Sequence, residues 1–287
     1  MLNSNDFKVI SDLYAILHRA RHGLRSLLSV HGNAMPNIAS LHDILGHRSE
    51  LPTIFAPDVR VFAQFGEDII VKSILQAAFP DRYENGEITY LDAGANHPIN
   101  MSNTWLLYKD GHRGVLVEPN LELCDELSRV RSEDVVLQCA LSDTYTTEQK
   151  LYLHKKHELS SLDFEFSTKF HSLRGLDPQP LREVVVPTEH IGDVLAKHFP
   201  HQPPDFISID LEGFDLRILR QIDFTTYSPA IICIEPSDEL SPEGEIPNSI
   251  RIRELLQRVG YILISKTPAN LIFVKIEVIK PKANTLV

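Results

Sequence analysis

The sequence has few cysteines, no long apolar run and a deficit of positive charge. Its 3 cysteines, Cys124, Cys139 and Cys233, form no close pair, which argues against a zinc site and suits a reducing compartment. No apolar run approaches the roughly 20 residues that cross a bilayer. A formal net charge of −11 disfavours DNA or RNA as a partner. The first residues, MLNSNDFKV, lack the pattern of a secretory signal, so we expect a cytoplasmic protein.

Residues 1–58 are expected to form a helical extension in front of a main domain at 59–287. Leucine and isoleucine recur there at helical spacing, which predicts a helix near 6–30. Pro52 and Pro57 mark a loop that follows. We expect the apolar side of the helix to pack on the main domain or to form a homodimer. Its basic cluster suggests, as an alternative, contact with an acidic surface or membrane headgroups.

The rest of the chain alternates between apolar strands and helical segments, which predicts a mostly parallel α/β sheet. The expected strands lie at 88–92, 114–118, 135–140, 206–211 and 230–235. Two final apolar runs, YILIS and LIFVKIEV, are joined by KTPAN and predict an antiparallel hairpin. Together these runs predict a Rossmann-like, seven-stranded sheet.

The segment 143–188 interrupts the alternation. It contains KLYLH and REVVVP, which are expected to pair as extra strands. Insertions near strand ends often shape substrate pockets, and a plain surface excursion is the alternative.

The first chemical feature is LDAGANHP at 91–98, where an apolar strand ends in Asp92 and a turn follows through Gly94. Ligands of such sheets bind at the carboxyl ends of the strands. A dinucleotide fingerprint needs three glycines to cradle a pyrophosphate, and this turn has one. S-adenosylmethionine (SAM) carries no phosphate, and its amino group needs a carboxylate. His97 is either a base beside the methyl donor or a structural histidine of the turn.

The next two predicted strands also end in polar residues. Glu118 ends the strand GVLVE, where an acidic side chain can accept hydrogen bonds from both ribose hydroxyls. CALSD ends the third strand and places Ser142 and Asp143 where an adenine edge is expected. Each carboxylate alone can be a helix cap. Their shared edge of the sheet favours a site for a nucleoside.

Further carboxylates follow the last two parallel strands. Asp210 ends FISID, and Glu235 ends IICIE. Neighbouring strands bring these two side chains together, where they either share a proton as a general base or bind Mg²⁺. Glu212 and Asp215 are placed to cap the next helix.

These blocks together resemble the FkbM-type methyltransferases over roughly 61–275. The resemblance begins with AQFGED at 63–68, is most specific in YLDAGANHPINMSNTWLLYKDGHRGVLVEPN at 90–120, and continues through CALSD and IDLEGFDLRIL. Ala63 and Ser208 depart from the family pattern, which usually has serine and lysine there.

The resemblance implies a class I methyltransferase fold, SAM as cofactor and, for many members, O-methylation of sugars or natural products. It places Asp210, Glu212 and Gly213 at the acceptor. It assigns the donor site to a larger set: Gln64, Glu67, Asp68, Asp92, Gly94, Asn96, Glu118 and Asp143.

Methyl transfer to a hydroxyl requires alignment of the acceptor and withdrawal of its proton. Asp210 is the first candidate base, with His97 and Glu212 as alternatives. A nicotinamide-dependent oxidoreductase is disfavoured by the missing glycines. A non-catalytic binding module is disfavoured by the intact acidic residues at the strand ends.

Overall fold

The computed structural model describes residues 60–155, 159–238 and 245–279. The helix expected near 6–30, the domain boundary expected after residue 58 and the proposed dimer contact lie outside these residues. Within the described part of the chain, no helix is long and apolar enough to cross a bilayer.

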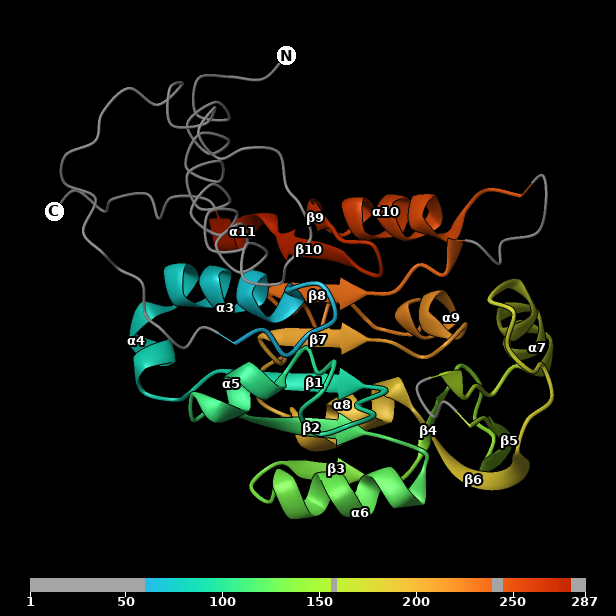
Figure 1. The fold of residues 1–287 in the computed structure, drawn as a ribbon. Helices are drawn as coiled ribbons and strands as arrows, with labels where there is room; N and C mark the ends of the chain where they lie inside the picture. Colours follow the sequence, from blue (N-terminus) through green and yellow to red (C-terminus); the bar gives the residue numbers. More distant parts are fainter. Residues whose placement is uncertain (1–59, 156–158, 239–244, 280–287) are drawn as a thin grey trace, which may run out of the picture. The chain divides into compact units, whose positions relative to one another are not determined.

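The main element is a seven-stranded sheet with the order β3-β2-β1-β7-β8-β10-β9 (Figure 1). Its strands are β1 (Thr89–Ala93), β2 (Arg113–Val117), β3 (Val135–Leu137), β7 (Phe206–Ile209), β8 (Ile231–Ile234), β9 (Tyr261–Lys266) and β10 (Leu271–Lys275). The first five run parallel, whereas β10 pairs antiparallel with both β8 and β9. The predicted mostly parallel sheet with an antiparallel hairpin is therefore confirmed.

Helices that precede, connect and follow the strands cover the sheet, which is why its central strands are apolar on both faces. They are α3 (Glu67–Ala78), α4 (Pro80–Glu84), α5 (Trp105–Lys109), α6 (Leu121–Val130), α8 (Ile191–His198), α9 (Asp215–Leu219), α10 (Asn248–Arg258) and α11 (Ile276–Ile279). Every residue of β7 and β8 is buried. Ile207 and Ile209 pack into one core with apolar side chains of α8, α9 and α10.

A second, three-stranded sheet has the order β4-β6-β5 and lies beyond the arrowheads of the central strands (Figure 1). It consists of β4 (Ala140–Ser142), β5 (Glu148–Leu153) and β6 (Arg182–His190). The expected pairing of KLYLH with REVVVP is confirmed as the antiparallel β5–β6 pair. The helix α7 (Phe164–Leu173), which the sequence pattern did not predict, is capped by Asp163, whose side chain accepts from Phe166 N at 3.0 Å.

The prediction of a single strand at 135–140 is wrong. The backbone turns after Leu137, where Cys139 N donates to Leu137 O at 3.0 Å. Residues before the turn continue the main sheet, and Ala140–Ser142 pair parallel with β6 instead. Continuous apolar residues hid this turn, because a run without alternation looks like one buried strand.

Candidate functional site

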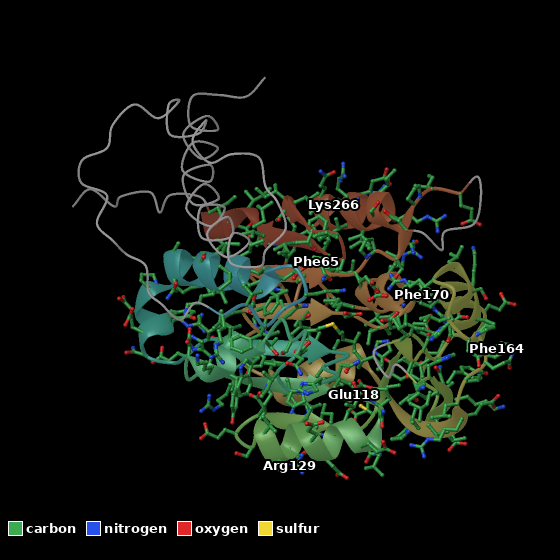
Figure 2. The ribbon with its side chains drawn as sticks, viewed as in Figure 1. Phe65, Glu118, Arg129, Phe164, Phe170 and Lys266 are labelled. Carbon is green, nitrogen blue, oxygen red and sulfur yellow. The ribbon has the colours of Figure 1, made fainter. Side chains whose placement is uncertain are left out.

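The carboxyl ends of β1, β2 and β7 border a cavity of about 580 Å³. Phe65, Glu118, Phe170 and Lys266, labelled in Figure 2, line it from four separate parts of the chain. Leu151 and other residues of the 143–188 insertion form one wall. The insertion is therefore part of the pocket and not a plain surface excursion. Cavities of this size accommodate a small-molecule ligand.

The turn after β1 depends on Gly94. Its φ of +85° lies in the left-handed region, and an added Cβ would stand 1.9 Å from the carbonyl oxygen of Asp210. Gly94 N and Ala95 N both donate to Val117 O, at 3.0 and 3.1 Å. The glycine thus allows the end of β1 to lie directly against the backbone that follows β7, and it also lines the cavity.

Replacing Gly94 with alanine is expected to lower the free energy of unfolding by about 3 kcal/mol or more, because a backbone clash adds to conformational strain. Denaturant unfolding measures this loss. Gly111→Ala is the matched control, since Gly111 also has a positive φ (+99°) but no atom of the described residues within 4 Å of an added Cβ. Strain alone is expected to cost that control roughly 1–2 kcal/mol. Equal losses in the two variants would show that the close approach to Asp210 is unimportant.

Glu118 follows β2 and is buried at the edge of the cavity. One carboxylate oxygen accepts from Asn96 N at 2.9 Å and the other from Asn120 N at 2.8 Å. Each carboxylate oxygen can accept two hydrogen bonds, so a second acceptor position remains on each. Burial raises the pKa of Glu118 to about 7, although the two backbone donors oppose that shift.

Asp92 also lines the cavity and is buried. Its Oδ2 accepts a hydrogen bond from the Thr104 hydroxyl at 2.5 Å. Burial raises the pKa of this carboxyl, while the positive charge of Arg131 and the Thr104 hydroxyl act in the opposite direction. Asn96, with a left-handed φ of 51°, completes this side of the cavity.

A group of four carboxylates lies beyond Asp92 at the ends of β7 and β8. Carboxylate oxygens of Asp210, Asp215 and Glu235 lie within 4.8 Å of one another, which confirms the predicted approach of Asp210 to Glu235. Burial and then the neighbouring Asp215 raise the pKa of Asp210 to about 7. Burial and then Glu235 raise the pKa of Glu212, and its Oε2 has no hydrogen-bond partner among the residues that the structure describes. Asp215 accepts from Leu211 N and Gly213 N, so it holds the turn before α9.

His97 is the structural histidine of its turn. Its Nδ1 accepts from Ile99 N at 3.0 Å and from Asn100 N at 2.9 Å, and the side chain does not line the cavity. A nitrogen that accepts two backbone hydrogen bonds is already engaged in holding the turn. The structure therefore does not bring this candidate base to the site.

Ser142 and Asp143 also lie away from the cavity, contrary to the sequence-based expectation. Both oxygens of Asp143 accept from Arg217, at 2.9 Å each, and Ser142 contacts the Thr144 hydroxyl at 3.1 Å. The cause is the turn after Leu137, which moves this segment into the second sheet. The cavity is lined instead by three preceding residues: Cys139, Ala140 and Leu141.

Glu67 and Asp68 do not line the cavity but hold segments that do, and Glu67 accepts hydrogen bonds from the side chains of Thr267 and Asn270, at 2.5 and 3.3 Å. Glu67 accepts from Phe65 N at 2.8 Å, and Asp68 accepts from Phe62 N at 2.8 Å. These contacts hold the segment that carries Gln64, which lines the cavity together with Phe65.

Three residues of the site escaped the sequence analysis: Asn103, Thr104 and Arg131. Arg131 is fully buried and donates to the Thr104 hydroxyl at 2.9 Å. The Asn103 amide donates to the Ser208 hydroxyl at 3.0 Å. The SNT sequence at 102–104 was the signal for Asn103 and Thr104. No sequence motif near Arg131 distinguishes it from a surface arginine.

In a comparison with protein families, residues 92–263 match the methyltransferase FkbM domain. The chain belongs to the FkbM methyltransferase family. The match covers the end of β1, the Glu118 region, the whole insertion and both acidic strand ends. This FkbM protein is therefore a SAM-dependent methyltransferase, as the sequence motifs indicated.

No curated protein matches the chain. Among solved structures, an O-methyltransferase from Bacillus cereus in complex with SAH is 13% identical, with 84% of this chain and 93% of that chain covered and a TM-score of 0.38. A TehB-like SAM-dependent methyltransferase from Corynebacterium glutamicum is 13% identical, with 70% and 92% covered and a TM-score of 0.31. Both TM-scores are low, so the fold assignment rests on the strand order given above.

Proposed function

We propose that this FkbM methyltransferase transfers the methyl group of SAM to a hydroxyl of a sugar or natural-product acceptor. The observation that carries the proposal is the position of Asp210. It lines the same cavity as Asp92 and Glu118, and it also belongs to the carboxylate group at the ends of β7 and β8. One cavity therefore combines donor-binding groups with a proton acceptor.

The donor half of the cavity suits SAM. Glu118 retains an acceptor position on each oxygen, which matches the two hydroxyls of a ribose. Asp92 supplies a buried carboxylate for the amino group of the methionine portion. The turn through Gly94 has no run of glycine amides to cradle a phosphate, and SAM needs none.

The acceptor half suits a hydroxyl nucleophile. Bound SAM supplies a methyl group on a positively charged sulfur. With a pKa of about 7, Asp210 is partly ionised at neutral pH and able to take the hydroxyl proton. Carboxylates near Asp210 favour its protonated form, which strengthens it as a base. Phe170 and Leu159 of the insertion give the same space an apolar wall for the body of the acceptor.

Calorimetry and a turnover screen test this proposal together. SAM is expected to bind and NAD is not, and labelled SAM is expected to mark an alcohol in a panel of sugars and polyketides, read by mass spectrometry. Binding of NAD alone would favour the oxidoreductase. Binding of SAM with transfer to amines only would contradict the O-methylation, and no binding of SAM would identify a non-catalytic module.

Turnover is expected to survive removal of divalent cations. Burial and the repulsion of neighbouring carboxylates favour the protonated form of Glu212, which lowers the total negative charge of the four carboxylates without a metal. The measurement is initial rate after EDTA treatment, with and without added Mg²⁺. Loss of activity that Mg²⁺ restores would instead make Asp210 and Glu235 metal ligands.

A further inference from the structure

The environment of Asp92 contains two hydroxyl groups whose hydrogen-bond directions are determined by their neighbours. Arg131 donates through Nη1 to the Thr104 hydroxyl at 2.9 Å, and this hydroxyl lies 2.5 Å from Asp92 Oδ2. A guanidinium has donors and no acceptor, so the Thr104 oxygen must accept from Arg131. The one hydroxyl hydrogen of Thr104 is then directed at Asp92 Oδ2, which is much nearer than the other neighbouring oxygen, Ser102 Oγ at 3.5 Å.

The second hydroxyl belongs to Ser208 on β7, and the same argument gives the direction of its hydrogen bond. The Asn103 amide nitrogen donates to Ser208 Oγ at 3.0 Å, and Ser208 in turn hydrogen-bonds the Asp92 carboxyl. An amide NH₂ only donates, so the Ser208 hydrogen is also available for Asp92. Two donated hydrogen bonds favour the ionised carboxylate over the protonated acid.

The other contacts of Thr104 and Arg131 do not compete with the hydrogen bonds that lead to Asp92. Thr104 precedes α5 at the N-cap position, but its side chain makes no capping hydrogen bond. Arg131 is anchored by Asp134 and by the Tyr90 hydroxyl, and none of its side chain is exposed. A buried arginine with all these partners is a stable source of positive charge beside the cavity.

We propose that Arg131 and Thr104 form a positioning relay that holds Asp92 ionised and oriented for the amino group of SAM. Asn103 and Ser208 support it from the side of β7. The inference rests on the proposed role of Asp92 in donor binding. It adds a function for residues that do not themselves contact the donor's amino group. Arg131 acts through Thr104, so it is a positioning residue and not a catalytic one.

Other charged and titratable groups also act on Asp92. Arg131 and Asp134 act on it from the segment between α6 and β3, Asp210 from the end of β7, Glu118 from the end of β2 and Cys233 from β8. All of these remain in a Thr104 variant. A change in pH dependence caused by that variant therefore reports on the hydroxyl.

Thr104→Val is the decisive variant, because valine keeps the shape and removes the hydroxyl. The affinity for SAM, measured by calorimetry, is expected to fall about tenfold near neutral pH. Loss of the hydroxyl raises the pKa of Asp92, so the gap from wild type should widen as the pH is lowered from about 8 to about 6. Thr104→Ser is expected to restore wild-type affinity at every pH.

Controls separate this relay from a general packing defect. Thr226→Val removes an exposed hydroxyl that donates to Asp223 at 2.8 Å and is expected to leave SAM affinity unchanged. Ser208→Ala is expected to weaken binding in the same direction as Thr104→Val, which keeps a result available if the first variant does not fold. An affinity loss in Thr104→Val that is equal at every pH, or that serine does not rescue, would overturn the relay. Absence of SAM binding to the wild type would overturn the proposed function instead.

Discussion

The Asp210→Asn variant is expected to bind SAM as the wild type does and to lose methyl transfer by a factor of about 10² to 10⁴. Asparagine has nearly the shape of aspartate but does not accept the hydroxyl proton. Calorimetry with SAM and single-turnover transfer to the identified acceptor measure the two effects. Asp223→Asn, at an exposed position outside the cavity, is the matched control. Unchanged turnover in Asp210→Asn would remove this residue as the base.

The same variant is expected to be more stable than the wild type at neutral pH. Folding raises the pKa of Asp210 from 3.8 to about 7. The contribution of Asp210 to the free energy of unfolding is therefore fully present below about pH 4, and it is lost as the pH rises through 7. Asparagine carries no charge to desolvate and avoids this loss. Melting temperatures of both proteins should therefore converge in acid and separate towards neutral pH. If Asp210→Asn is less stable than the wild type at neutral pH, burial of the Asp210 charge does not destabilise the fold as proposed.

Glu118→Gln is expected to weaken SAM binding by about 10- to 100-fold while the fold persists. The glutamine oxygen can accept from only one of Asn96 N and Asn120 N, and its NH₂ group opposes the other donor. One acceptor for the ribose is lost as well. Isothermal calorimetry measures the affinity, and circular dichroism checks the fold.

Glu122→Gln provides the comparison for Glu118→Gln, because Glu122 is an exposed residue of α6 whose ion pair with Arg182 is also exposed. Such surface pairs contribute about 0–1 kcal/mol, so SAM affinity should not change. Equal affinities of wild type and Glu118→Gln would exclude Glu118 from the donor site.

These two active-site variants test different halves of one cavity. Glu118→Gln is expected to change donor affinity, and Asp210→Asn is expected to change the transfer step. An effect of Asp210→Asn on SAM affinity as large as its effect on turnover would show that the carboxylate group belongs to donor binding.

Local sequence patterns were sufficient to predict the main sheet and the residues at its carboxyl edge. Apolar runs that end in Asp92, Glu118, Asp210 and Glu235 carry this information directly. Parallel strands place their carboxyl ends at one edge, so residues that follow different strands converge there whatever lies between them. This is why the approach of Asp210 to Glu235 was predictable.

Contacts between distant segments determined the rest of the site. The turn after Leu137 depends on the pairing of Ala140 with Thr188, and it turns Asp143 away to Arg217. Arg131 comes close to Asp92 only because the segment after α6 folds against Thr104 and against Tyr90 of β1, and no local pattern encodes that approach. Periodicity and strand ends are properties of neighbouring residues, whereas the partner of a buried polar side chain is chosen by whichever segment folds against it.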